Sequence, residues 1–306
     1  MIYENVEELI GDTPLLKLNK IKKELKLDCD LYGKLECFNP AGSIKDRAAL
    51  QMINDYEEKG LLNKDTTIIE ETSGNTGIGL ACICAIRGYR LIIVMPENMS
   101  KERILTMKAY GAEVILTKKE LGMQGAVDKV NELHSQIKGS LIAGQFDNPS
   151  NPKAHYLTTG PEIWNDLDGK VDYLVAGIGT GGTISGIGKY LKEKNKDIKI
   201  IGVEPYNSSI LNGGKAGPHN LQGIGANFIP DNLDRSIYDE IIDVKEEDAY
   251  YYGKMLGKKE GILVGITAGA ALYASTLIAK REKNKNIVVI LPDGGSKYLS
   301  TEMYKE

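Results

Sequence analysis

Lys45 is the residue whose chemistry the sequence marks most clearly. It lies in the stretch 39–47, Asn-Pro-Ala-Gly-Ser-Ile-Lys-Asp-Arg, which has the composition of a loop leading into a helix. A lysine amine beside glycine and serine at such a junction is suited to forming a Schiff base with a carbonyl group. Taken alone, a lysine followed by aspartate and arginine is more often a solvated residue at a helix start. Two further segments of the sequence favour Schiff-base formation by Lys45 over this plainer alternative.

The segment 177–183, Gly-Ile-Gly-Thr-Gly-Gly-Thr, follows an apolar strand and opens a helix. Successive backbone N–H groups and the helix dipole make an anion site there, and glycine allows close approach, so the segment predicts a phosphate site. Its Gly-x-Gly-x-x-Gly spacing, with Glu204 about 20 residues further on, also fits a dinucleotide-binding fingerprint. A tight turn without any ligand is the plainer alternative.

The segment 72–77, Thr-Ser-Gly-Asn-Thr-Gly, also lies between a strand and a helix. Its hydroxyls and amides converge where a helix N-terminus favours negative charge, so it predicts a site for an amino-acid α-carboxylate. A simple N-cap would explain one such residue, but six together exceed what capping needs. A phosphorylated aldehyde cofactor, pyridoxal phosphate, uses Lys45 and both segments, whereas a nicotinamide dinucleotide leaves Lys45 and 72–77 unexplained.

Composition limits the classes of function. The chain has 306 residues, a net charge of -4 and no basic strip, so nucleic acid is not an expected partner. The first residues lack the layout of an export signal and no apolar run reaches the roughly 20 residues that span a bilayer, so we expect no membrane partner and a cytoplasmic location. We predict no metal site, and we assign the dispersed histidines to surface or core polar contacts. They are His134, His155 and His219.

Short apolar runs alternate with helical-period segments, which is typical of α/β proteins with parallel sheets. The first series has strands at 66–70, 91–95, 113–117 and 141–143, with helices near 75–87, 101–110 and 123–138. The second has strands at 173–176, 199–203 and 287–291, with helices near 182–194, 246–258 and 268–281. The two series are separated by the proline-bearing stretch 147–152. Open parallel sheets bind ligands at the carboxyl ends of strands, so we expect the two units to enclose a crevice.

With these segments in place, the chain resembles the cysteine synthase (O-acetylserine sulfhydrylase) and cystathionine β-synthase family of fold-type II pyridoxal-phosphate enzymes. The likeness covers nearly the whole chain and includes the stretches 10–15, 95–103, 145–149, 159–164, 222–225 and 265–270. It implies a tryptophan synthase β-like architecture, with two open, twisted, mostly parallel sheets flanked by helices and the active site between two domains. It also implies a homodimer, with a smaller domain at 36–148 and a larger one at 1–35 and 149–306.

By matching position, the resemblance implies a role for each predicted site residue. Lys45 would form the covalent link to pyridoxal 5'-phosphate, and Asn75 would hydrogen-bond its ring oxygen. The cofactor phosphate would be held by Gly179, Thr180, Gly181, Gly182 and Thr183. The substrate carboxylate would be held by Thr72, Ser73, Thr76 and Gln145, and Ser73 is counted with Lys45 as catalytic. Thr267 falls where the family places a hydroxyl on the pyridine nitrogen, although serine is more familiar there.

The activity that the resemblance implies is β-replacement on a β-substituted L-amino acid. Lys45 takes the α-proton as general base, the β-substituent leaves an aminoacrylate, and a thiol or sulfide adds. A neutral Thr267 hydroxyl cannot stabilise a pyridinium as an aspartate does, so we expect prompt β-elimination to outcompete transamination. The expected reaction is that of cysteine synthase, in which O-acetylserine and sulfide give L-cysteine and acetate.

Asn227 leaves the substrates open. The sulfhydrylase pattern usually has glycine at this position, and the cystathionine β-synthase pattern has aspartate. An amide near the β-carbon can hydrogen-bond a thiol or a second amino acid but cannot act as a base. A turn asparagine is the plainer alternative. A second expectation is therefore a cysteine-consuming reaction that releases hydrogen sulfide and gives lanthionine or cystathionine. A non-catalytic binding or sensor protein of the same fold is a third, which no feature requires.

Overall fold

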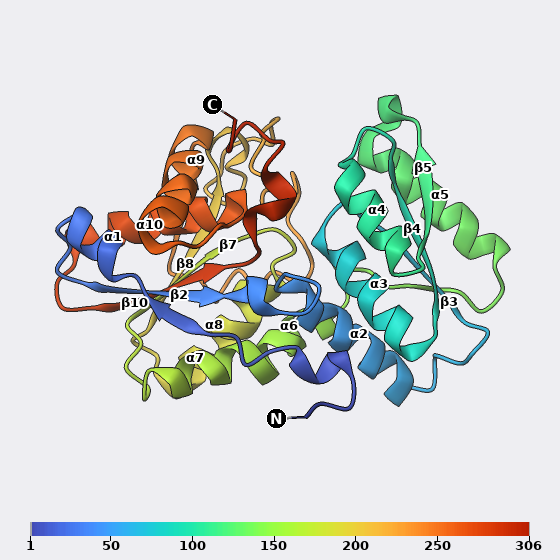
Figure 1. Cartoon of the computed structure of the whole chain (residues 1–306), viewed down its shortest axis with the longest axis horizontal. Coiled ribbons are helices and arrows are strands. Elements are labelled where there is room, and N and C mark those ends of the chain that lie inside the picture. The colour runs from blue at the N-terminus through green and yellow to red at the C-terminus, as the bar shows by residue number, and fades with distance from the viewer. Residues whose placement is uncertain (1, 306) are drawn as a thin grey trace. The chain divides into compact units, whose positions relative to one another are not determined.

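The computed structural model describes residues 2–305, which fold into two compact units (Figure 1). The first unit holds the residues up to 10 together with 39–151, and the second holds 11–38 and the residues from 152 onward. Each unit carries one sheet flanked by helices, which confirms the expected fold class. The assignment of 36–148 to one domain stays a prediction. Within the described residues, no helix has the length and apolar character needed to cross a membrane.

The sheet of the first unit has four parallel strands in the order β5-β4-β3-β6. Its strands are β3 (Thr67–Glu71), β4 (Arg90–Pro96), β5 (Glu113–Thr117) and β6 (Leu141–Ile142). The helices of this unit are η1 (Val6–Leu9), α2 (Lys45–Glu58), α3 (Asn75–Arg87), α4 (Lys101–Ala109), η3 (Lys119–Leu121) and α5 (Gly122–Gln136), and α6 (Ser150–Ala154) begins at its end. The strands agree with the predicted ranges to within a residue.

Neighbouring residues of β3 face opposite layers of this unit. Ile68 packs with Met52 of α2 and Ile78 of α3, whereas Ile69 packs with Val130 of α5. Because side chains alternate across a strand, the consecutive buried residues of β3 place side chains on both faces of the sheet. Helices α2 and α3 therefore cover one face of the sheet, and α5 covers the other.

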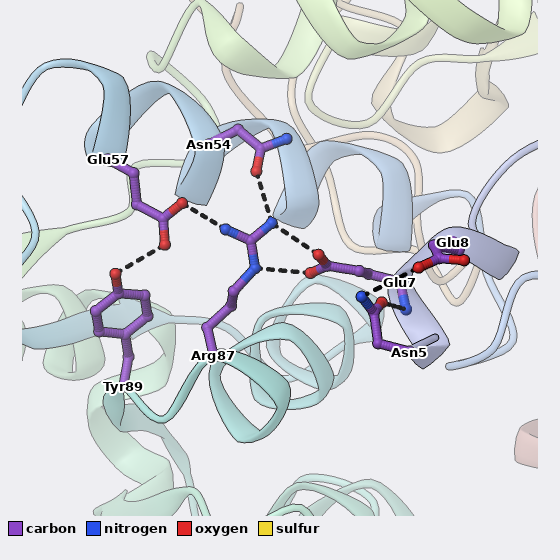
Figure 2. A network of polar contacts seen from close by, with 7 residues as sticks. All are labelled: Asn5, Glu7, Glu8, Asn54, Glu57, Arg87 and Tyr89. Atoms are coloured by element: carbon purple, nitrogen blue, oxygen red, sulfur yellow. Dashed lines mark hydrogen bonds and ion pairs between the residues drawn. The ribbon is translucent and has the colours of Figure 1, made fainter. Parts of the chain in front are cut away.

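The C-terminal ends of α2 and α3 meet at the guanidinium of Arg87 (Figure 2). Arg87 donates to both carboxylate oxygens of Glu7, at 2.7 and 2.9 Å, and to Asn54 Oδ1 at 3.1 Å. It also pairs with Glu57, which accepts from the Tyr89 hydroxyl at 2.7 Å. A planar guanidinium with five donors can bind several acceptors at once. This network ties η1 to the two helices that carry the predicted lysine and carboxylate sites at their other ends.

The sheet of the second unit has six strands in the order β1-β2-β10-β7-β8-β9, and only β1 runs antiparallel among the described strands. Its strands are β1 (Leu15–Lys17), β2 (Asp30–Leu35), β7 (Tyr173–Gly177), β8 (Lys199–Pro205), β9 (Glu240–Val244) and β10 (Asn286–Leu291). Its α-helices are α1 (Asn19–Glu24), α7 (Gly160–Asp166), α8 (Gly182–Lys194), α9 (Glu246–Met255) and α10 (Ile266–Arg281). Shorter helical segments are η2 (Glu36–Phe38), η4 (His155–Thr159), η5 (Tyr206–Ser208), η6 (Leu256–Glu260) and η7 (Gly295–Tyr298).

Strand β2 was not predicted, because a lysine lies in its buried interior. Lys34 is fully buried, and its Nζ lies 2.8 Å from Glu162 Oε2 and 3.5 Å from Asp166 Oδ2. It also donates to the carbonyl oxygen of Thr13 at 2.6 Å. A buried ammonium is stable only when it is paired and hydrogen-bonded. Both acidic partners of Lys34 come from α7, more than a hundred residues away. The sequence of β2 alone therefore does not identify it as a strand.

We predict that Arg87→Ala lowers the thermal midpoint of unfolding by a few degrees. The substitution leaves Glu7 and Glu57 without their shared cation, which costs about 2 kcal/mol for partly buried groups, or roughly 3 °C in a chain of this size. The matched control is Arg90→Ala, which removes an exposed pair with Glu113 and should cost less than about 0.5 kcal/mol. Scanning calorimetry measures both, and equal midpoints would contradict the structural role of Arg87.

Candidate active site

Lys45 opens α2, and the loop before it is held by the carboxylate of Asp46. The backbone N–H of Ala41 donates to Asp46 Oδ2 at 2.6 Å, and the N–H of Lys45 donates to Ser43 Oγ at 3.2 Å. Asp46 is buried in the first helical turn, where the helix dipole favours a carboxylate. Gly42 adopts φ +82, a conformation that side chains disfavour. The backbone of Lys45 is therefore fixed, and its side chain is half-buried.

Asn75 opens α3, close to the start of α2. At Gly79, one turn further along, an added Cβ would lie 3.0 Å from the carbonyl oxygen of Lys45 and 3.3 Å from Ala49 Cβ. A side chain at position 79 would push the two helices apart, so the glycine sets their separation. The structure thus places Lys45 and Asn75, both of which the resemblance assigns to the cofactor, at neighbouring helix starts in one unit.

Thr76 and Gln145, two predicted carboxylate ligands, are in direct contact. Thr76 Oγ1 donates to Gln145 Oε1 at 2.6 Å, and both residues are buried. Gln145 Nε2 also donates to the carbonyl oxygen of Glu71 at 3.4 Å. Thr72 Oγ1 accepts the backbone N–H two residues further on, at 3.3 Å, and Ser73 between them is half-buried. Residues 72–77 after β3, which we call the hydroxyl loop, and the turn after β6 therefore form one polar site.

The predicted phosphate loop joins β7 to α8 in the second unit. Gly181 is the N-cap of this 13-residue helix and has φ +81. At position 179, an added Cβ would lie 2.3 Å from the carbonyl oxygen of Gly223. At position 181, it would lie 2.7 Å from Leu233 Cβ. These contacts leave no space for side chains at positions 179 and 181. The loop therefore presents backbone N–H groups at a helix N-terminus, an arrangement that binds anions.

Thr183, in the first turn of α8, is linked to a buried histidine. Its Oγ1 lies 3.4 Å from His155 Nε2, and His155 Nδ1 lies 3.0 Å from Thr159 Oγ1. His155 is fully buried, which agrees with its assignment to a core polar contact. Its contact with the phosphate loop was not anticipated, because His155 and Thr183 are 28 residues apart and no local pattern links them.

Thr267 packs against both the end of β7 and the loop that follows Gln222. Its Oγ1 donates to the carbonyl oxygen of Gln222 at 2.9 Å. An added Cβ at Gly177 would lie 2.7 Å from Thr267 Cγ2, and one at Gly223 would lie 2.9 Å from Thr267 Oγ1. The structure thus brings Thr267 next to the phosphate loop. Its contact with a pyridine nitrogen stays a prediction.

Asn227 is exposed and adopts φ +65, a conformation in which asparagine is tolerated and glycine is unstrained. Its Oδ1 accepts a hydrogen bond from Ser208 Oγ at 2.6 Å. Ser208 itself is buried at the end of η5. The side-chain oxygen of Asn227 is therefore engaged with the protein, and its role toward a substrate stays a prediction.

Glu204 does not fit the dinucleotide alternative. Its two carboxylate oxygens each accept a backbone N–H at 3.0 Å, from Leu211 and Asn212. Burial, with further repulsion from Asp243, raises the pKa of Glu204 to about 7 despite these bonds. An acid that binds a dinucleotide must accept a hydrogen bond from a ribose hydroxyl. The carboxylate of Glu204 instead accepts hydrogen bonds from the backbone of residues 211 and 212.

Comparison with known proteins places the chain in a family. The model of a family described as pyridoxal-phosphate dependent enzyme matches residues 6–293. A cysteine synthase of Staphylococcus aureus strain Mu50 is 48% identical over 303 residues, which are 98% of this chain and 97% of that protein. The chain belongs to the family of pyridoxal-phosphate dependent enzymes.

Solved structures of this family are similar over the whole chain. The cysteine synthase of Entamoeba histolytica has a TM-score of 0.97 and 44% identity, with 100% of this chain and 92% of that chain covered. A hydrogen sulfide-producing enzyme of Fusobacterium nucleatum has a TM-score of 0.93 and 48% identity, with 97% and 100% covered. These similarities confirm the expected resemblance.

The cofactor of this family is pyridoxal 5'-phosphate, and the residues present fit it. At Gly179 and Gly181 the loop has no space for side chains, so its backbone at the N-terminus of α8 can approach a phosphate closely. Lys45, at a fixed helix start, provides the amine that a carbonyl cofactor requires. The enzyme class and the cofactor predicted from the sequence are therefore confirmed.

We predict that Gly179→Ala loses most of its affinity for pyridoxal phosphate. The added methyl would meet the carbonyl oxygen of Gly223 at 2.3 Å, so the loop must shift. Its N–H groups would then no longer point toward the same phosphate position. We expect the dissociation constant to rise at least about 30-fold, or about 2 kcal/mol. Titration followed by the visible band of the bound cofactor measures it.

The matched control is Gly257→Ala in the same unit. A Cβ there would meet the flexible end of Leu263 at 3.3 Å and the carbonyl oxygen of Ile262 at 3.8 Å, which is ordinary contact, so cofactor affinity should stay within about twofold of wild type. Equal affinities for Gly179→Ala and Gly257→Ala would show that the 177–183 loop does not hold the phosphate.

Proposed function

We propose that this chain is a cysteine synthase that replaces the acetoxy group of O-acetylserine with sulfide, giving L-cysteine and acetate. One observation carries the proposal. In a single unit, a lysine at a fixed helix start lies beside a second helix start that follows a hydroxyl-rich loop suited to a carboxylate. The proposal is supported by similarity to cysteine synthases along almost the entire chain.

The cofactor would be held at several points by residues of this chain. Lys45 would bind it covalently through Nζ, Asn75 would hydrogen-bond its ring oxygen, and residues 179–183 would bind its phosphate. Thr267 would offer its hydroxyl to the ring nitrogen. When bound, pyridoxal phosphate supplies the electron sink that makes the substrate α-proton acidic and allows the β-substituent to leave. A neutral hydroxyl at the ring nitrogen keeps that sink weak, which favours β-elimination over transamination.

The substrate carboxylate would be bound by the hydroxyl loop and the glutamine that it contacts. The donors we assign to it are Thr72, Ser73, Thr76 and Gln145. Hydrogen bonds to both carboxylate oxygens restrict the amino acid to one orientation before reaction, which removes translational and rotational freedom in advance. Thr76 and Gln145 are buried, so water competes little for these bonds.

Lys45 would also move the proton. When its Nζ is not engaged with the cofactor, Lys45 would be placed to accept the substrate α-proton as general base. The protonated Nζ can then assist departure of the β-substituent. Ser73, half-buried in the adjoining loop, is the second residue that we place in the catalytic set.

A second reaction is supported by a specific observation. The hydrogen sulfide-producing enzyme of Fusobacterium nucleatum shares 48% identity with this chain. Here cysteine would be the donor, sulfide would leave, and a thiol amino acid would add to give lanthionine or cystathionine. Asn227, with its side chain fixed by Ser208, is our candidate for contacting such a nucleophile. We further propose that the enzyme is a cytoplasmic homodimer, on the strength of the family resemblance.

Product analysis tests the proposed reaction. The holoenzyme is given O-acetylserine with sulfide, cysteine alone, and cysteine with homocysteine in separate reactions, and the amino-acid products are identified by mass. We expect cysteine from the first mixture at a rate at least about tenfold above product formation in the others. Lanthionine or cystathionine with released sulfide, and no cysteine synthesis, would favour the second reaction.

We predict that Asn227→Gly separates the two nucleophile classes. Glycine suits the backbone at φ +65, so folding should be unaffected while the amide is removed. The kcat/KM for sulfide should stay within about threefold, whereas that for a thiol amino acid should fall about tenfold, the value of one lost hydrogen bond. Asn284→Gly is the matched control, since Asn284 also has a positive φ, +55. Equal losses for both nucleophiles would contradict a role in selecting between them.

A further inference from the structure

Glu70 is a buried acid that the proposed chemistry does not use. It lies on β3, two positions before the first residue of the hydroxyl loop, and is fully buried. Its Oε2 accepts the backbone N–H of Gly144 at 2.8 Å, and its Oε1 accepts that of Gln145 at 3.4 Å. One carboxylate on β3 therefore anchors the turn after β6, at the residue whose side chain contacts Thr76.

The turn that Glu70 anchors has little freedom of its own. Gly144 adopts φ +69, and an added Cβ there would lie 2.5 Å from Asp147 Oδ1. The carbonyl oxygen of Gln145 accepts from Asn151 Nδ2 at 2.9 Å. The backbone of Gln145 is thus held on one side by the Glu70 carboxylate and on the other by Asn151.

Three titratable groups act on Glu70 from the elements around it. Glu71 is on the same strand, Asp147 is in the turn after β6, and Tyr56 is on α2. A further acid on α2, Asp55, is bound by Gln51 and Ser150. The layer formed by α5 meets β3 through apolar side chains, such as Val130. Among the described residues, the titratable groups that interact electrostatically with Glu70 are therefore two acids and a phenol.

We propose that Glu70 is a positioning residue whose charge state sets the affinity of the Thr76–Gln145 site for the substrate carboxylate. When Glu70 is neutral, it accepts the two N–H groups and adds no charge. When it is ionised, it places a buried negative charge two positions before the hydroxyl loop. In a medium of low dielectric, this charge repels the bound carboxylate. This inference rests on the proposed role of Gln145 as a carboxylate ligand.

The pH range follows from the surroundings of Glu70. Burial, followed by the charge of Glu71, raises the pKa of Glu70 to about 8, against the opposing effect of its two N–H donors. Glu70 is thus mostly neutral below pH 8 and ionised above it. Carboxylate affinity should fall as the pH rises through this value. By linkage, carboxylate binding near pH 8 should be accompanied by proton uptake.

Calorimetry of propionate binding to the holoenzyme tests this inference. Propionate has the carboxylate of the substrate but no amine, so it does not itself titrate between pH 6.5 and 9.5. We expect its dissociation constant to rise about tenfold between these limits, with a midpoint near pH 8. Titrations in buffers of different ionisation enthalpy should show uptake of a fraction of a proton near the midpoint.

Three variants make the assignment specific. Glu70→Gln should remove the midpoint and the proton uptake, because the amide cannot ionise. Glu71→Gln should keep both but move the midpoint to lower pH, because it removes the repelling charge. Glu204→Gln is the matched control, since Glu204 is also a buried acid that accepts two adjacent N–H groups, and it should keep the wild-type midpoint.

The inference is overturned if Glu70→Gln retains the proton uptake, if wild type shows none, or if propionate does not bind. Thermal midpoints of the variants establish that each is folded. If Glu70→Gln fails to fold, the pH midpoint of propionate affinity in Glu71→Gln still tests the proposal. An unchanged midpoint in Glu71→Gln would contradict it. Because propionate binding needs no turnover, this failure is distinct from failure of the proposed cysteine synthesis.

Discussion

The close contact between α2 and α3 is the constraint on which the first unit depends. Gly79 lets α3 approach the carbonyl oxygen of Lys45, so that a Cβ at this position would sit only 3.0 Å away. At their other ends the same helices share Arg87, which also binds the N-terminal segment through Glu7 (Figure 2). Fixed at both ends, the pair holds the amine of Lys45 and the hydroxyl loop before Asn75 at neighbouring helix starts. A catalytic lysine and a substrate site need this fixed relation more than they need any single strong contact.

The sequence predicts the features that depend on local pattern. The glycine loop and the hydroxyl loop were recognised because residues of one type follow an apolar strand within a few positions, and both open helices at the predicted residues, 182 and 75. Strand β2 was missed because Lys34 interrupts its apolar pattern and is neutralised by acids from α7. The contacts of His155 with Thr183 and of Glu70 with Gly144 were also missed. Both join residues that only the tertiary fold brings together.

Two buried glutamates give the units a common design. Glu70 at the end of β3 and Glu204 on β8 each bind two consecutive backbone N–H groups of a following loop. In each case burial raises the carboxyl pKa, and another acid lies nearby. Loops at the carboxyl ends of parallel strands have few sheet bonds of their own, so an acid from the strand fixes them. In the first unit, this arrangement is the basis of the pH dependence that we propose for the Thr76–Gln145 site.

The proposed catalytic site requires that Lys45 is the residue that holds pyridoxal phosphate. Reduction of the holoenzyme with borohydride, followed by peptide mapping by mass, tests this most directly, because reduction makes the link between amine and cofactor permanent. We expect the cofactor to be found on the peptide containing residues 39–47, attached at Lys45, and we expect Lys45→Ala to carry no label while remaining folded. Label on another lysine, with Lys45 unmodified, would contradict the catalytic assignment made for this chain.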